Sequence, residues 1–293
     1  MNHILEVQKL KKRFPKSDFL LDDLSFSLPY GSIMGFVGEN GAGKTTTISC
    51  ILNMLTKDSG TIRLFGREMS DDDKEIREDI GVVFDASNFS GILNADQVGK
   101  VMAGIYTRWD QSLYTNYLNR FKLPSEQKIR TYSKGMTMKL ALASALAHSP
   151  KLLLLDEATS GLDPVVRDDI LDVFLEFVQE EDHSILLSSH ITSDLEKIAD
   201  YITFIHDGRI VLSEKKDDLI YNYAVLRCKS SQFAKLDKKD VITYRKRDYQ
   251  IDVLVSDRQD AERKYGGFAT DNMVIDNVDI DDIMLLLIKG EPV

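Results

Sequence analysis

GENGAGKT, at residues 38–45, is the stretch of sequence that decides the fold class. It fits the pattern G-x-x-x-x-G-K-[ST] and directly follows the apolar run Ile33–Val37, which predicts a buried strand. Glycines in such a loop let backbone N–H groups turn inward around an anion, and the helix that follows adds its positive end. With average residue usage the fixed positions match by chance in about 1% of chains of this length, so we interpret the stretch as a phosphate-binding loop.

The loop gives its residues separate predicted tasks. Lys44 is expected to reach the β- and γ-phosphates of a nucleoside triphosphate, and the Thr45 hydroxyl is expected to ligate Mg²⁺. The other residues predicted to contact the phosphates are Gly38, Asn40, Gly41, Ala42, Gly43 and Thr46. The predicted ligand is therefore a nucleoside triphosphate with Mg²⁺.

A second feature is a run of leucines that ends in two acids, Asp156 and Glu157. The run at residues 152–155 is typical of a strand that is buried on both faces of a parallel sheet. Two adjacent carboxylates at its end suit one Mg²⁺-organising acid and one water-activating base. By itself an acid after an apolar run is also typical of a solvated strand end. Together with the loop at 38–45, it indicates a catalytic pair.

The rest of the chain alternates predicted strands and helices, which indicates an α/β fold. Further strands are expected at residues 3–10, 61–65, 81–84 and 184–187, and a hairpin joins 201–205 to 209–212. Helices are predicted at 71–79, within 94–121, at 134–148 and after Pro164. After residue 221, strands at 224–227, 241–244 and 250–255, short helices and an acidic-then-apolar segment at 279–288 predict a small α+β domain.

Three further stretches carry a family resemblance. They are Tyr132-Ser133-Lys134-Gly135-Met136, the sequence ATSGLDP at residues 158–164, and Ser188-Ser189-His190. In this order, with the loop at 38–45, residues 1–218 resemble the nucleotide-binding domain of the ABC ATPases, which are P-loop NTPases. The resemblance implies a domain at 1–221 with a RecA-like core, an antiparallel β subdomain and a helical subdomain at about 86–135. The accessory domain then covers residues 222–293.

The resemblance implies roles within one chain. Phe14 matches the aromatic residue that stacks on the adenine of ATP, although a core aromatic is the alternative. Asp156 matches the Walker B acid at the metal, and Glu157 matches the general base. His190 matches the switch histidine that senses the γ-phosphate, where an ordinary loop histidine is the alternative.

The resemblance also implies that two chains sandwich two ATP molecules head to tail. Ser133 and Gly135, with Lys134 between them, would then contact the γ-phosphate held by the opposite subunit. Ser133 is also a good helix N-cap, and both roles are compatible. Asp163 belongs to the loop that communicates across this interface.

Two positions depart from the family pattern. Asp85 stands where a glutamine is usual, and we retain it as a predicted Mg²⁺ ligand because carboxylates suit that metal. We expect hydrolysis to survive, with a stronger dependence on Mg²⁺. Lys134 replaces a glycine; it either adds a cation beside the anion pocket or points to solvent, and of the two we favour solvent.

Composition restricts the partners. The net charge of −10 and a pI near 5.1 argue against a nucleic-acid partner. No apolar stretch reaches the roughly 20 residues that span a bilayer, and residues 1–13 lack the apolar core of a secretion signal. Cys50 and Cys228 lack metal-ligand spacing and are expected to be reduced. The partners that the resemblance implies are a separate membrane-spanning subunit and a second copy, or a related ATPase, at the cytoplasmic face of the membrane.

Several functions compete. The favoured one is the ATPase subunit of a bacterial exporter for drugs or antimicrobial peptides. Non-transport relatives that act on DNA carry a long coiled-coil insertion, and those that act on ribosomes carry two such domains; neither feature is present. A mechanical or regulatory module acting on a membrane partner stays open. So does the purpose of the C-terminal domain, and whether Phe89, Ile92 and Leu93 receive a partner helix or pack onto their own subdomain.

Overall fold

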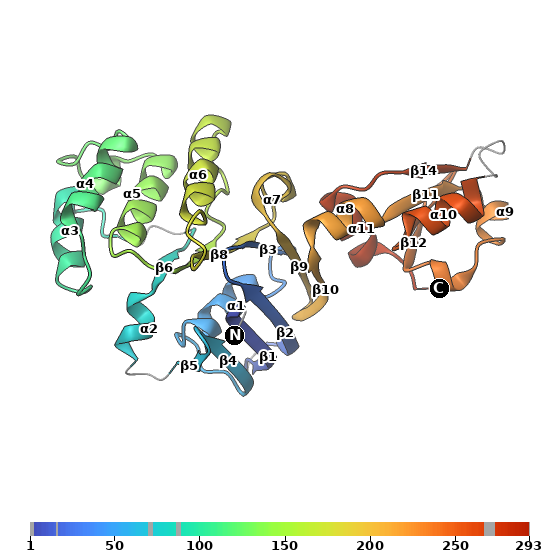
Figure 1. Cartoon of the computed structure of the whole chain (residues 1–293), viewed down its shortest axis with the longest axis horizontal. Coiled ribbons are helices and arrows are strands. Elements are labelled where there is room, and N and C mark those ends of the chain that lie inside the picture. Colours follow the sequence, from blue (N-terminus) through green and yellow to red (C-terminus); the bar gives the residue numbers. More distant parts are fainter. Residues whose placement is uncertain (1–2, 16, 70–72, 86–88, 267–272, 293) are drawn as a thin grey trace.

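A computed structural model describes residues 3–15, 17–69, 73–85, 89–266 and 273–292. Its strands form three sheets. Figure 1 shows a central sheet of six strands beside an antiparallel sheet that contains the N-terminal strand, and a third sheet, near the C-terminus, at one end of the molecule. Parts of the predicted helix at 71–79 and of the predicted helical subdomain at 86–135 lie outside the described residues.

The central sheet has six strands in the order β10-β9-β3-β8-β7-β6. All adjacent pairs are parallel except the hairpin of β9 and β10. The strands are β3 (Ile33–Val37), β6 (Ile80–Val83), β7 (Leu152–Asp156), β8 (Ser184–Ser189), β9 (Tyr201–His206) and β10 (Arg209–Lys215). In β3, β7 and β8 every residue is buried, which confirms the leucine run as an interior strand. Because parallel strands end at one edge, this topology gathers the predicted site there.

A second, antiparallel sheet has the order β2-β1-β4-β5. Its strands are β1 (His3–Arg13), β2 (Leu20–Pro29), β4 (Ser59–Leu64) and β5 (Arg67–Glu68). The sequence analysis missed β2, although Leu24, Phe26 and Leu28 alternate and are buried. The pair Asp22-Asp23 interrupts this alternation, and Asp23 has a φ of 61° where the register to β1 shifts. The irregularity hides the period of two by which a strand is identified.

The helices of the first 200 residues cover the central sheet and form a separate helical layer (Figure 1). They are α1 (Lys44–Ile51), α2 (Lys74–Glu78), α3 (Ala95–Ala103), α4 (Gln111–Arg120), a 3₁₀ turn (Ile129–Thr131), α5 (Lys134–Leu146), α6 (Pro164–Phe177) and α7 (Thr192–Ile198). Helix α5 begins where expected and ends at Leu146, two residues earlier than predicted. Fully buried Tyr114 of α4 donates from its hydroxyl to the Ala95 carbonyl (2.8 Å), which ties α4 to α3.

The loop residues Phe89, Ile92 and Leu93, which either receive a partner helix or pack onto their own subdomain, differ in their burial. Phe89 and Leu93 pack against the hydrophobic core of their own chain. Ile92 is 68% exposed, so a partner can reach it, whereas Phe89 and Leu93 are partly buried.

The third sheet has the order β12-β13-β11-β14 and lies within the last 70 residues or so. Its strands are β11 (Ala224–Cys228), β12 (Thr243–Lys246), β13 (Ile251–Val255) and β14 (Val274–Asp276). The helices of this part of the chain are α8 (Lys216–Asn222), α9 (Ser230–Phe233), a 3₁₀ turn (Lys238–Asp240), α10 (Arg258–Tyr265) and α11 (Ile280–Lys289). Helix α11 connects this module to α7, because Ile280 and Ile283 share a buried cluster with Leu195. The Ile280 N–H also donates to Glu196 (2.8 Å).

Two expectations drawn from composition can be compared with the structure. Both cysteines are free and buried, and burial raises the pKa of the Cys50 and Cys228 thiols to about 11, which makes them poor nucleophiles. Of the helices in the described ranges, none combines the length and apolar character needed to cross a bilayer.

Candidate nucleotide-binding and catalytic site

The loop at residues 38–45 is shaped as an anion cradle between β3 and α1. Gly41 and Gly43 have φ angles of 84° and 114°, which L side chains rarely adopt. A Cβ at Gly38 would clash with the Ile205 carbonyl, so the backbone there passes too close for any other residue. Because Gly43 is also the N-cap of α1, the first N–H groups of that helix are left for an external anion.

The hairpin of β9 and β10 holds this loop from behind. The Gly208 N–H donates to the Ala42 carbonyl (3.0 Å), and the Gly208 carbonyl accepts from the Asp22 N–H (2.8 Å). The turn at Asp207-Gly208, predicted from the sequence, thus connects the phosphate loop to β2.

Lys44 and Thr45 point toward the acids at the end of β7. The Lys44 ammonium is buried, donates to the carbonyls of Gly38 (2.7 Å) and Glu39 (3.3 Å), and lies 3.2 Å from Glu157 Oε1. A buried cation surrounded mainly by dipoles suits a strongly anionic ligand. The Thr45 hydroxyl donates to Asp156 Oδ2 (2.6 Å).

Asp156 is almost fully buried and accepts a second hydrogen bond, from the Ser188 hydroxyl. The hydroxyl of Thr45 and the carboxylate of Asp156 are oxygen donors of the kind that Mg²⁺ prefers. No group of three or more His, Cys, Asp or Glu side chains within the described residues is arranged to hold a metal. Thr45 and Asp156 would supply two oxygen ligands to Mg²⁺.

Glu157 sits at the centre of the site in a strained conformation, with a φ of 54°. Its N–H donates to the Ser188 carbonyl (3.0 Å), which fixes the backbone at this angle. Its Oε2 lies 2.6 Å from Nδ1 of His190. Its buried Oε1 has no hydrogen-bond partner within the described residues, because the nearby Lys44 makes an ion pair without hydrogen-bond geometry. This oxygen is available to accept a proton.

A cavity of about 430 Å³ opens in front of these groups. Its lining consists of Phe19, Asn40, Gly41, Gly43, Lys44, Thr45, Thr46 and Glu157. A neighbouring hollow of about 590 Å³ is lined by Phe14, Pro15, Ser17 and Phe19. Half-buried Phe14 is absent from the core clusters of the described residues, which disfavours the alternative of a core aromatic.

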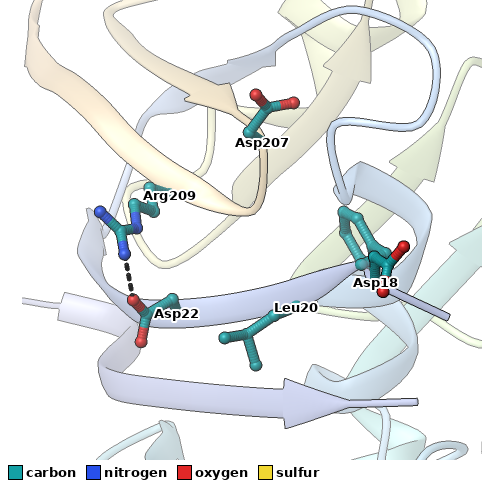
Figure 2. Close-up of a pocket in the computed structure, with 6 residues that line it drawn as sticks. Asp18, Leu20, Asp22, Asp207 and Arg209 are labelled. Carbon is teal, nitrogen blue, oxygen red and sulfur yellow. Dashed lines mark hydrogen bonds and ion pairs between the residues drawn. The ribbon is translucent and has the colours of Figure 1, made fainter. Parts of the chain in front are cut away.

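Phe19 is the site residue that the sequence analysis missed. Its ring lies between the two hollows, with a centroid 6.3 Å from that of Phe14, and it also borders a third pocket beside the hairpin. Figure 2 shows that pocket, where Arg209 pairs with Asp22 (2.6 Å). The only signal in the sequence was a second aromatic residue close to Phe14, just before β2.

The remaining predicted residues cap two helices that lie side by side. The Ser133 hydroxyl accepts from the Met136 N–H (3.2 Å) at the start of α5, and Asp163 accepts from the Val166 N–H (3.1 Å) at the start of α6. A Cβ on Gly135 would lie 3.2 Å from Val166, so the two helix starts are in contact. Ser133 and Asp163 are both exposed.

The side chain of Lys134 is 46% exposed, and the preference for a solvent-directed lysine stays a prediction. The Lys134 ammonium lies 2.7 Å from Asp85 Oδ1, so the two positions that depart from the family pattern form an ion pair. The role of Asp85 as a metal ligand stays a prediction, and its carboxylate is engaged by this cation.

Comparisons with known proteins agree with this geometry. The family described as ABC transporter matches residues 21–160. The bacitracin transport ATP-binding protein BcrA of Bacillus licheniformis is 34% identical over 213 residues, which cover 72% of this chain and 69% of that protein. The lantibiotic transport ATP-binding protein SrtF of Streptococcus pyogenes is 33% identical over 218 residues, which cover 73% and 92%.

A solved structure of the ATP binding subunit of an ABC transporter superposes with a TM-score of 0.67 at 26% identity, over 74% of this chain and 91% of that one. The predicted fold class, the family and the cofactors ATP and Mg²⁺ are confirmed. The chain belongs to the ABC transporter family as one of its ATP-binding proteins, an ATPase that uses Mg-ATP.

Proposed function

We propose that this chain powers the export of a peptide antibiotic, or of a comparable amphipathic compound, through a separate membrane-spanning subunit. It would act at the cytoplasmic face of the membrane. The substrate class is supported by the similarity to proteins named for bacitracin and lantibiotic transport. ATP hydrolysis as the source of energy for export is supported by one observation: Lys44 and the acids Asp156 and Glu157 converge on the cavity beside the phosphate loop.

Within one chain, each of these residues has a defined task. Lys44 would exchange its loop carbonyls for phosphate oxygens, and the N–H groups at the start of α1 would hold the remaining phosphate charge. Thr45 and Asp156 would hold Mg²⁺, which when bound neutralises charge on the β- and γ-phosphates.

Glu157 and His190 would act on the attacking water. Oε1 of Glu157, which has no hydrogen-bond partner within the described residues, would take the proton of a water molecule, while Nδ1 of His190 holds Oε2 and so fixes the direction of the carboxylate. His190, which directly precedes the N-cap residue of α7, would also sense the γ-phosphate. Phe14 and Phe19 would contact the nucleoside.

A second copy of the chain, or a related ATPase, would close the site. Ser133 and Asp163 lie at exposed helix starts, whose positive ends favour a phosphate that arrives from outside the chain. Gly135, beside Ser133, lets the starts of α5 and α6 lie in contact, so that both helix starts are presented together. Hydrolysis would convert the γ-phosphoryl group to inorganic phosphate, and release of that phosphate would remove the anion that joins the two chains and reopen the dimer.

Transport is tested in membrane vesicles that contain the chain and the membrane protein that co-purifies with it. Inside-out vesicles supplied with Mg-ATP should accumulate a labelled bacitracin-type or lantibiotic peptide, and vesicles with Lys44→Ala should not. If the vesicles hydrolyse ATP and the partner changes conformation, but no member of a peptide and drug panel moves, the export proposal fails. A regulatory module is then the better account.

A further inference from the structure

A partly buried ion pair joins α6 to α7, outside the residues that line the nucleotide cavity. Arg167 lies near the start of α6, and Asp194 lies in the first turn of α7. Nη1 of Arg167 is 3.8 Å from Oδ1 of Asp194, and the two side chains are 26% and 3% exposed. A carboxylate that is removed from water needs a cation or hydrogen bonds to compensate its charge. The guanidinium of Arg167 supplies that cation.

Arg167 also holds the loop that precedes α6. Its Nη2 donates to the Leu162 carbonyl (3.2 Å), next to Asp163, whose own side chain caps α6. The loop begins at Glu157, where the Glu157 carbonyl accepts from the Ser160 N–H (3.0 Å). One arginine side chain therefore fastens the far end of a loop that starts at the proposed base.

Asp194 belongs to the helix that follows His190. The N-cap residue of α7, Ile191, lies directly after His190, and Asp194 is three residues further along. Nδ1 of His190 lies 2.6 Å from Oε2 of Glu157. Because α7 is a short rigid element, a displacement of the helix also displaces the histidine that orients the base.

The contact between Arg167 and Asp194 is an ion pair without a hydrogen bond. Nε of Arg167 and Oδ2 of Asp194 are buried, and both atoms have no hydrogen-bond partner within the described residues. Charge-assisted N–H···O bonds are about 2.7–2.9 Å long, so the two groups can approach by about 1 Å. Shifts of packed helices by this amount are typical of conformational switches. The pair can therefore tighten when α7 moves toward α6.

We propose that Arg167 is a positioning residue for ATP hydrolysis, which together with Asp194 couples the place of His190 to that of the loop at residues 157–163. When α7 moves with the histidine, Asp194 approaches or leaves the guanidinium, and the bond to the Leu162 carbonyl passes this movement to the loop. The arginine acts through these neighbours. The inference rests on the proposed function, from which it takes the role of His190.

The test measures ATP hydrolysis by the full chain, with kcat and KM determined separately. Fluorescence of a Mant-ATP probe, at a protein concentration too low for dimers, gives the affinity of the single chain, and thermal unfolding gives the stability. The variants are Arg167→Gln, Arg167→Lys, Asp194→Asn and the double variant of Arg167→Gln with Asp194→Asn. The matched control is Lys197→Gln, which removes the exposed ion pair of Lys197 with Asp168 (3.3 Å) between the same two helices.

A positioning role predicts a loss in kcat alone. Arg167→Gln and Asp194→Asn should each lower kcat about tenfold, the scale of a small misplacement of a catalytic group, while KM and the affinity for Mant-ATP stay near those of the parent. Because the two side chains act together, the double variant should be no slower than either single variant. Arg167→Lys keeps a cation beside Asp194 and should recover part of the rate. Lys197→Gln should match the parent.

Two precautions keep the test decisive. Arg167→Gln leaves a buried carboxylate without its cation and can fail to fold, but Asp194→Asn and the double variant leave no buried carboxylate unpaired at this position. In a His190→Ala background, Asp194→Asn should cause little further loss of kcat, because the histidine through which the pair acts is already gone.

Several results would overturn the inference and leave the ATPase assignment intact. One is a folded Asp194→Asn or double variant that turns over at the parent's rate. Another is an undiminished tenfold loss on adding Asp194→Asn to His190→Ala. A third is a fall in melting temperature and in Mant-ATP affinity that parallels the loss of turnover, since it indicates a structural role only. If His190→Ala itself keeps the parent's turnover, the proposed role of the histidine fails, and the inference fails with it.

Discussion

The carboxylate of Glu157 lies 2.6 Å from Nδ1 of His190, so the end of β7 and the loop after β8 are joined by one hydrogen bond. This contact leaves the other carboxylate oxygen, Oε1, buried and without a hydrogen-bond partner within the described residues. The arrangement separates two tasks: the histidine orients the base, and the base faces the cavity in front of Lys44.

Removing the base should therefore stop the chemical step and spare binding. We expect Glu157→Gln to lower the ATPase rate at least ~100-fold, the scale of a lost proton-transfer group. Mg-ATP should still bind, and an ATP-bound dimer should accumulate. Phosphate-release kinetics and size-exclusion chromatography measure the two effects, with Glu181→Gln at an exposed surface position as the matched control. Turnover at the parent's rate would refute the assignment of the base.

Removing the residue that orients the base should have a smaller effect of the same kind. His190→Ala leaves the Glu157 carboxylate in place but frees its direction, so we expect a turnover loss of about 10- to 100-fold. The affinity of the single chain for Mant-ATP should stay near that of the parent. His190→Gln, which can still donate to Oε2, should recover part of the rate. A histidine variant that loses nucleotide affinity but keeps its turnover at saturating ATP would contradict this division of tasks.

The two aromatic residues beside the phosphate loop should contribute to nucleoside affinity separately. Because Phe19 borders both hollows, Phe19→Ala should weaken Mant-ATP binding by up to about tenfold, as Phe14→Ala should. Phe19→Leu retains bulk and should recover part of the loss. Calorimetry with ATP and with inorganic triphosphate separates base contacts from phosphate contacts. Equal losses for both ligands would show that Phe19 acts only on the shape of the loop.

A buried histidine far from the catalytic residues should make stability depend on pH. His148 is fully buried, stacks on Tyr106 at 3.9 Å and bonds the Ile80 carbonyl (3.1 Å). Burial lowers the pKa of His148 below its ordinary value of 6.5. The unfolded chain therefore binds a proton at His148 more readily than the folded chain does. The contribution of neutral His148 to the free energy of unfolding is fully present above about pH 6.5, and it falls as the pH drops toward the pKa of His148 in the folded chain.

Thermal unfolding of the parent and of His148→Gln, measured from pH 7.5 to 5.5, checks this expectation. The parent should lose more of its melting temperature across this range than the variant, which cannot take up the proton. Parallel curves for the two proteins would show that His148 does not set the dependence.

The contact between the C-terminal module and α7 should matter for the whole fold. Ile283 of α11 is fully buried in the cluster that contains Leu195, so Ile283→Ala should destabilise the protein by about 2–5 kcal/mol. Ile92→Ala, at a position that is 68% exposed, should change stability by less than about 0.5 kcal/mol. Urea unfolding followed by circular dichroism measures both. Equal, small effects would mean that the module folds without support from α7.

Much of the fold and of the site was predictable because its signals are local. The glycine loop, the leucine strand with its acids and the Asp207-Gly208 hairpin each lie within a few consecutive residues, where backbone geometry and burial follow from residue type. Strand β2 was missed because an irregularity at Asp23 breaks its alternation.

Other features depend on segments that only folding brings together. The partner of Lys134 could not be predicted, since Asp85 reaches it from another strand of the sheet. The place of Phe19 beside Gly43 likewise depends on how β2 packs against the phosphate loop, and the contact of Ile280 with Glu196 depends on how the C-terminal module folds back on α7.

The central claim is that the glycine loop, Lys44 and the acids at the end of β7 together bind a nucleoside triphosphate with Mg²⁺. Isothermal titration of the purified chain with ATP, with and without Mg²⁺, tests it most directly. The account predicts saturable binding that Lys44→Ala abolishes, with a clear loss of affinity when Mg²⁺ is withdrawn or Asp156 becomes Asn. A chain that takes up no Mg-ATP, or a Lys44→Ala variant that binds it as tightly as the parent, would contradict the account.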